Sequence, residues 1–191
     1  MEKDYQDRRR FFRIEDEIIL SVRVISAQEL EDYCQNDGAE LSPFTLGGLF
    51  AAVDNEFAPM FNKLRKSAPE CAKCFEAINR KLDLLAQLIS GEVLSSQDEM
   101  HAVTANLSAS GIAFYSKEKL KLGQILELKL VLLPKKIGLL LHGVVKQLRP
   151  DSSGSLVCVD FIRTKEDDQE LLVKHTISKQ MLSLRKDKNN D

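Results

Sequence analysis

Apolar and polar residues alternate with a period of two in several short runs, which is the pattern of half-buried β-strands. The first run spans residues 18–25, where Leu20, Val22 and Val24 share one face. Strand-like alternation ends at residue 25 and resumes near His101. From that point the pattern predicts strands at 102–105, 112–115, 126–132, 139–148 and 156–162. Several short strands at this spacing predict a small antiparallel barrel or sandwich.

The stretch between these strand signals has a helical period instead. Apolar residues recur at alternating spacings of four and three, which makes an unbroken heptad seam: Phe57, Phe61, Leu64, Ala68, Cys71, Phe75, Ile78, Leu82, Leu85 and Ile89. Pro69 interrupts the helical pattern and lies within a capping-box pattern at residues 67–70, so we expect a kink or a helix restart near Ser67. Gly91 is expected to end the helix. The same pattern fits packing on the chain's own barrel, but a narrow sustained stripe favours self-association.

These patterns divide the chain into four parts. Residues 1–26 hold a basic arm and the first strand, residues 27–97 a helical insertion with the heptad helix at about 57–90, and residues 98–185 the remaining strands and a C-terminal helix. That last helix is expected at 166–184, with Val173, Ile177, Met181 and Leu184 on one face. Residues 186–191 are expected to fray, and residues 27–56 to form a short helical or irregular lead-in.

Charge and composition exclude several classes of protein. The net charge of −2 argues against an extended surface for nucleic acid. No apolar run reaches the length of about 20 residues that a membrane span needs, so no membrane insertion is expected. The N-terminus lacks the apolar core of a signal peptide, and the four cysteines lie in unlike contexts. We therefore expect a reduced, cytoplasmic protein.

Positive charge is concentrated in one short segment, the arm at residues 8–13. Its arginines are Arg8, Arg9, Arg10 and Arg13. Guanidinium groups hold phosphates and guanine edges through planar, bidentate hydrogen bonds. Far along the chain, residues 106–111 read Asn-Leu-Ser-Ala-Ser-Gly, a small polar turn that allows close backbone approach. Together the two segments predict a site for a compact anionic nucleotide.

The two segments also resemble the paired motifs of PilZ domains. Residues 9–13 fit the family's Arg-x-x-x-Arg element, and residues 106–111 fit its Asp/Asn-x-Ser-x-x-Gly element. The resemblance covers about residues 8–26 and 98–185. The chain also resembles PilZ variants whose inserted heptad helix drives tetramer formation. It implies a six-stranded antiparallel β-barrel, so the fold expected is mostly β with a helical insertion.

The resemblance implies cyclic di-GMP as the ligand. Arg9 and Arg13 match the first motif and would contact guanine edges and phosphates, with Arg10 as an additional contact and Arg8 as a weaker one. From the second motif, Asn106 would meet a base edge and Ser108 a phosphate or base, while Gly111 would supply a backbone conformation that side chains disfavour. Ligand binding would order the arm across the barrel and change the surface offered to an unidentified downstream protein.

No pattern in the chain supports catalysis or a cofactor. Cys71 and Cys74 have metal-ligand spacing, but they lack a second ligand pair and lie within the heptad helix. The three histidines are scattered; His142 lies in a strand that could reach the ligand rim, although a structural role fits it better. We expect a non-enzymatic receptor, without metal, that forms dimers or tetramers through Phe75, Ile78, Leu82, Leu85 and Ile89. The alternative is an oligomeric PilZ-like scaffold whose ligand site does not function.

Overall fold

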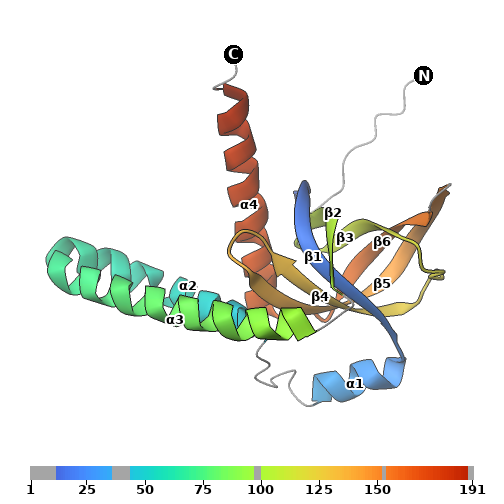
Figure 1. The fold of residues 1–191 in the computed structure, drawn as a ribbon, viewed down its shortest axis with the longest axis horizontal. Coiled ribbons are helices and arrows are strands. Elements are labelled where there is room, and N and C mark those ends of the chain that lie inside the picture. Colours follow the sequence, from blue (N-terminus) through green and yellow to red (C-terminus); the bar gives the residue numbers. More distant parts are fainter. Residues whose placement is uncertain (1–11, 36–43, 97–99, 152–153, 189–191) are drawn as a thin grey trace.

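The six strands close into one antiparallel barrel with the order β1-β2-β3-β6-β5-β4 (Figure 1). The computed structural model describes residues 12–35, 44–96, 100–151 and 154–188. The strands are β1 (Ile14–Ile25), β2 (His101–Ser108), β3 (Gly111–Ser116), β4 (Ile125–Leu132), β5 (Ile137–Asp151) and β6 (Gly154–Ile162). The expected fold class, a six-stranded barrel with a helical insertion, is confirmed.

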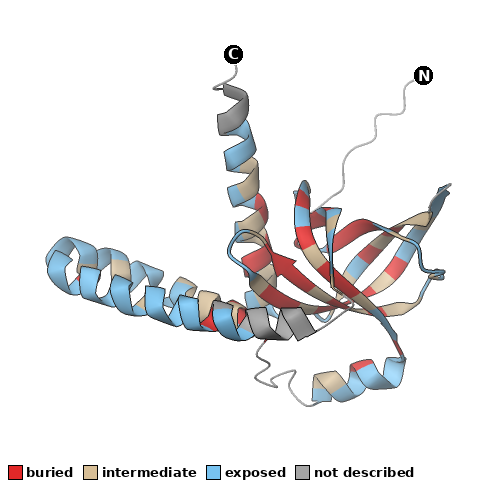
Figure 2. Ribbon diagram, viewed as in Figure 1, coloured by how far each residue is buried: buried red, intermediate tan, exposed pale blue. Residues whose placement is uncertain are grey.

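Alternate apolar residues fill the barrel interior as the strand pattern predicted, except near the end of β1, where Val24 of the expected buried face is exposed. Ile18 and Leu20 of β1 and Leu126, Leu128 and Leu130 of β4 are almost completely buried. Figure 2 shows the same alternation as bands of buried residues along the strands. Full burial of one such side chain stabilises the fold by about 1.5–3 kcal/mol, so this core holds the barrel's shape.

Helix α1 (Ala27–Gln35) follows β1 and contacts the barrel through Tyr33, whose ring centroid lies 4.5 Å from that of His142 of β5. A capping box starts it: the Glu29 amide donates to Ser26 Oγ at 3.1 Å, and the Ser26 amide donates to Glu29 Oε2 at 2.7 Å. Glu29 also accepts from Arg23 of β1, which pairs in turn with Glu127 of β4. The first part of the 27–56 lead-in is therefore a regular helix.

The insertion forms a helical hairpin rather than one rod. Helix α2 (Leu46–Ser67) ends where the sequence predicted a restart, and α3 (Pro69–Ser96) begins at the proline. The two helices run back antiparallel, with Arg65 paired to Glu76 near the turn (Figure 1). Two expected boundaries are wrong. The helical segment begins at Leu46 instead of residue 57, and α3 continues through Gly91, because a glycine in a helix costs only about 1 kcal/mol.

The stripe that faces α2 is not the heptad seam. On α3, Ala72 and Ala86 are buried, and Asn79 Nδ2 donates to Asp54 Oδ1 of α2 at 3.0 Å. Small side chains at these positions let the two helices approach closely. The large seam residues lie about a quarter turn away and are roughly half exposed: Phe75, Ile78, Leu82, Leu85 and Ile89. The part of the seam on α3 is therefore not covered by α2.

The hairpin is attached to the barrel through a close contact with β5. A Cβ added at Gly138 would lie 2.1 Å from the carbonyl oxygen of Phe44, and one at Gly48 would lie 3.1 Å from that of Gly138. Phe44 is itself buried. Because only glycine fits so tight an approach at Gly138, the chain from Phe44 to Gly48 anchors the start of α2 on the barrel.

Helix α4 (Glu166–Lys188) packs on the barrel through its first turns. Leu171, Leu172 and Thr176 are buried there, whereas the expected face, including Ile177 and Met181, is largely exposed. The helix also continues past the predicted end at residue 184, to Lys188; the expected fraying of residues 186–191 stays a prediction. Residues 189–191 lie outside the described residues.

Candidate functional site

Strand register brings the two predicted motifs to one end of the barrel. Arg13 directly precedes β1 and is exposed. The first pair of the β1–β2 ladder joins Ile14 to Leu107, and the next joins Glu15 to Asn106. The base of the arm therefore lies beside the β2–β3 connection. Arg8, Arg9 and Arg10 lie outside the described residues, so their roles stay predictions.

Asn106 belongs to a strand, not to a turn as the sequence analysis expected. The β2–β3 ladder continues to the pair Ser108–Gly111, which leaves only Ala109 and Ser110 in the turn. Asn106 is exposed, between Glu15 of β1 and Ala113 of β3 in the register. The regular ladder extends the strand because each backbone group gains a partner there. Asn106 is thus exposed on the barrel surface.

Ser108 is fully buried, and its hydroxyl braces the turn. Oγ donates to the carbonyl oxygen of Gly111 at 3.1 Å and accepts from the amide of Ser110 at 3.3 Å. Such a side-chain bond fixes the turn's backbone. A ligand contact through Ser108 stays a prediction, and the arrangement gives this residue a structural task as well.

Gly111 is required for space rather than for an unusual backbone angle. Its φ does not lie in the left-handed region, so the expectation of a disfavoured conformation is wrong. A Cβ here would instead lie 2.4 Å from the carbonyl oxygen of Val159 on β6. Since β3 and β6 pair directly at this residue, any side chain would push the two strands apart.

A groove of about 710 Å³ runs between the start of β1 and α4. Volumes of about 300–1,000 Å³ are usual for small-molecule sites. Arg13 and Glu15 line it from β1, and Lys179 and Gln180 from α4. Asn106, Ser108 and Gly111 are not among its lining residues, although Asn106 adjoins it through its neighbour Glu15. Arg13 therefore stands between the groove and the Asn106 surface.

A buried carboxylate beneath this groove joins β1 to α4. Asp16 Oδ2 lies 2.6 Å from His175 Nε2, and Asp16 Oδ1 accepts from Lys179 Nζ. The Asp16 side chain is only 3 % exposed, so its two oxygens depend on these partners in place of water. Sequence reasoning missed this cluster. His175 and Lys179 are four apart on one helix face, but no local pattern points to a partner on a strand so far away.

Carboxylates also surround the predicted contacts. Glu15 pairs with Asn106 in the β1–β2 register, and exposed Asp160 pairs with Gly111 in the β3–β6 register. His142, the suggested rim residue, is buried with its ring centroid 4.5 Å from that of Tyr33. It packs under α1, and burial lowers its pKa.

Other kinds of site find no support in the described part of the chain. No group of three or more His, Cys, Asp or Glu side chains within those ranges is arranged to hold a metal ion. No helix among the described residues is long and apolar enough to cross a membrane. Cys71 and Cys74 are both exposed on α3, so the expected packing of Cys71 in a seam is not formed within the hairpin.

Comparison with known proteins decides the family. A family model described as the PilZ domain matches residues 79–178, just over half of the chain. The chain belongs to the PilZ domain family. The matched PilZ segment includes Asn106, Ser108 and Gly111, and it begins within α3, so the arm and β1 lie outside it.

Two solved structures resemble this PilZ protein. One is a Xanthomonas campestris protein described as a tetrameric PilZ domain self-assembled through a helical bundle; it is 18% identical, with a TM-score of 0.60, over 91% of this chain and 90% of that one. The other, a Bacillus subtilis inhibitor of motility, is 24% identical over 44% of each chain, with a TM-score of 0.36. No curated protein was found to match. The first likeness extends the shared fold to the helical hairpin.

Proposed function

We propose that this PilZ protein is a receptor for cyclic di-GMP. The observation that carries the proposal is the β1–β2 register, which sets Arg13 at the end of β1 beside Asn106 and the Ser108–Gly111 turn. The PilZ family match and the two motifs together suggest this ligand. No cofactor is part of the proposal.

The charges around the site support a role for the arm. Glu15 and Asp160 lie beside Asn106 and Gly111, so the strand surface alone would repel a phosphodiester. Arginines supply the missing positive charge and recognise guanine, since a guanidinium pairs with O6 and N7 together. Arg13 has a fixed base on β1, and Arg9 and Arg10 are proposed to complete the set.

The proposed response is closure of the arm. Charge-assisted hydrogen bonds from the arginines offset the entropy lost when the arm becomes ordered over the ligand. Because the groove beside Arg13 is shared with α4, closure changes a surface made of both elements. That surface is the one we propose to be read by a downstream protein.

We also propose that the hairpin joins copies of the chain. Its small residues, Ala72 and Ala86, face α2, while the large apolar ones are left in solvent. Helix α3 thus has a stripe of small residues that contacts α2 and, about a quarter turn away, a stripe of large apolar residues. This arrangement fits a bundle in which each helix packs against two neighbours. Helix α2 adds further exposed apolar residues: Leu49, Val53, Phe57 and Met60. The helical bundle named for the Xanthomonas relative supports this assembly.

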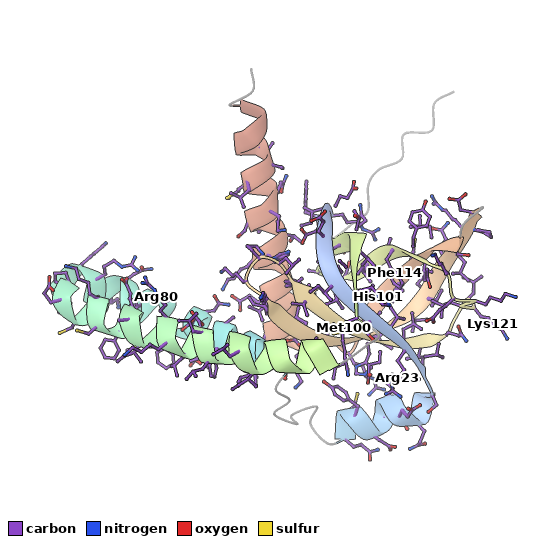
Figure 3. The ribbon with its side chains drawn as sticks, in the orientation of Figure 1. Arg23, Arg80, Met100, His101, Phe114 and Lys121 are labelled. Atoms are coloured by element: carbon purple, nitrogen blue, oxygen red, sulfur yellow. The ribbon has the colours of Figure 1, made fainter. Side chains whose placement is uncertain are left out.

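A pair of arginine variants tests the ligand site. Arg13→Ala removes the proposed contact, and Arg80→Ala is the matched control, because Arg80 is exposed on the distant hairpin (Figure 3). We expect Arg13→Ala to weaken cyclic di-GMP binding by about fivefold to 150-fold, from about 1–3 kcal/mol per bidentate contact. Arg80→Ala should bind like the wild type. Equal affinity of both variants in calorimetry would reject the assignment of Arg13.

A further inference from the structure

A cluster of lysines lies at one end of the barrel, away from the hairpin. It comprises the β3–β4 loop at residues 117–124 and the outer end of β5, and is here called the basic end. Figure 3 shows Lys121 projecting outward there. Its cations are Lys117, Lys119, Lys121, Lys146 and Arg149, all of them exposed.

Backbone pairing brings these separate segments together. The Gly123 amide donates to the carbonyl oxygen of Val145 at 2.9 Å, and the Val145 amide donates to that of Gln124 at 3.0 Å. The loop is thus fastened beside Lys146. Lys146 is the extra residue of a β-bulge between Val145 and Gln147, and such bulges redirect side chains out of the regular ladder.

The same surface continues across the sheet. Tyr115 of β3 pairs with Leu156 of β6, which pairs in turn with Arg149 of β5. Tyr115 is 58 % exposed and lies in this row. The sequence did not reveal the surface, because its cations come from two segments that are not adjacent in the chain.

The charge of the basic end is opposite to that of the whole molecule. The basic end contains five cations and two carboxylates, Glu118 and Asp151, whereas the whole chain carries a net charge of −2. Within the described residues, no ion pair joins any of the four lysines to a carboxylate. Their charge is therefore not cancelled locally.

An apolar side chain stands among these cations. Leu122 is 65 % exposed, next to Lys121 and close to Lys119 in the chain. Gly123 follows with φ of +79°, and open space surrounds it, so the loop turns at an exposed point. A leucine this exposed beside lysines is more favourably placed at the boundary between lipid headgroups and hydrocarbon than in water.

We propose that the basic end docks on the surface of an anionic lipid bilayer. Lysine is depleted at protein–protein interfaces, and four of the five cations here are lysines. Clustered lysines beside an exposed apolar residue are instead what a negatively charged headgroup layer attracts. The contact is peripheral and involves no spanning segment. It does not depend on the proposed ligand site.

Co-sedimentation of the full chain with vesicles tests the proposal. The probes are phosphatidylglycerol–phosphatidylcholine vesicles and pure phosphatidylcholine vesicles at low salt. The test variant is Lys117→Glu/Lys119→Glu/Lys121→Glu, and the control is Lys63→Glu/Lys66→Glu/Lys81→Glu, which makes the same charge change on exposed hairpin positions. Circular dichroism checks that each variant is folded.

We expect binding to the anionic vesicles only, weakened by added salt. The test variant should lose at least about a hundredfold in partitioning, since each lysine near such a surface contributes roughly fivefold. The control should bind like the wild type, and Leu122→Ser should bind several-fold more weakly. Absence of binding, or equal loss in both triple variants, would overturn the proposal. Binding to soluble polyglutamate without binding to vesicles would overturn it in favour of an acidic protein partner.

Discussion

Asp16 of β1 and His175 of α4 lie 2.6 Å apart, from the carboxylate Oδ2 to the ring Nε2, in a buried part of the interface. Asp16 is three residues after Arg13, so this contact fixes the strand from which the arm departs. Lys179 holds the other carboxylate oxygen of Asp16. The position of α4 and the base of the proposed ligand site are thus tied together.

Asp16→Asn should destabilise the fold. Loss of the charge weakens two hydrogen bonds, and bonds to charged groups contribute about 1.5–3 kcal/mol each, so a loss of about 1–3 kcal/mol in the free energy of unfolding is expected. Glu170→Gln is the control, because the Glu170–Lys174 pair is exposed and contributes about 0.5 kcal/mol or less. Urea denaturation measures both. If the Asp16→Asn protein were as stable as the control, the contact between Asp16 and α4 would not stabilise the fold.

Gly111→Ala should open the β3–β6 pairing. The added Cβ meets a backbone carbonyl at 2.4 Å, and crowding of this kind typically costs about 1–3 kcal/mol. Gly47→Ala is the matched change: its Cβ would find ordinary contacts at 3.8 Å and beyond, at the start of α2. There we expect no loss, or a gain of up to about 1 kcal/mol. Equal melting temperatures for the two variants would contradict the steric account of Gly111.

The free energy of unfolding should fall at acidic pH because of His142. Burial lowers the pKa of this side chain from its ordinary value of 6.5. Below pH 6.5 the unfolded chain therefore takes up a proton at this residue that the folded chain does not, and stability falls as the pH drops. Above that value this contribution is constant.

Replacement of His142 by Gln tests this assignment. The free energy of unfolding of His142→Gln should fall less steeply with acid than that of the wild type, although the variant starts from a lower value. His101→Gln serves as control because His101 is exposed. If removing His142 left the pH dependence unchanged, other groups would have to explain the acid sensitivity.

The hairpin should hold the oligomer together. Ile78→Glu/Leu82→Glu places charge on the exposed seam and should give monomers in sedimentation velocity, with helical content retained. Arg80→Glu/Lys81→Glu lies on the solvated positions of the same helix and should leave the assembly intact. A wild type that sediments as a monomer would remove the proposed role of the seam.

The barrel was predictable because period-two alternation reports directly which face of a strand is buried. The helix restart was predictable because Pro69 lies in a capping-box pattern at residues 67–70; a proline alone does not decide it, since α2 continues through Pro59. Which surface packs on the heptad seam could not be predicted, since heptad spacing identifies an apolar stripe but not the helix that covers it. Within this chain the partner of α2 is the smaller stripe of Ala72, Asn79 and Ala86.

The candidate site also has features that the local sequence predicts and features that only the packing of distant elements creates. Motif residues such as Asn106 could be located from local sequence, whereas the role of Gly111 depends on how closely β6 approaches. The Asp16–His175 contact joins residues 159 apart, and no periodicity connects a strand carboxylate with a helix histidine at that separation. Such contacts are created by the packing of α4 on the barrel.

Calorimetric titration of the wild-type protein with cyclic di-GMP tests the central proposal most directly, with cyclic di-AMP as the comparison ligand. Arginine pairs with guanine O6 and N7, whereas adenine places a donor where O6 would be. We predict saturable binding of cyclic di-GMP, and binding of cyclic di-AMP that is weaker by at least about tenfold. No heat of binding with cyclic di-GMP, or equal affinity for both dinucleotides, would contradict the account.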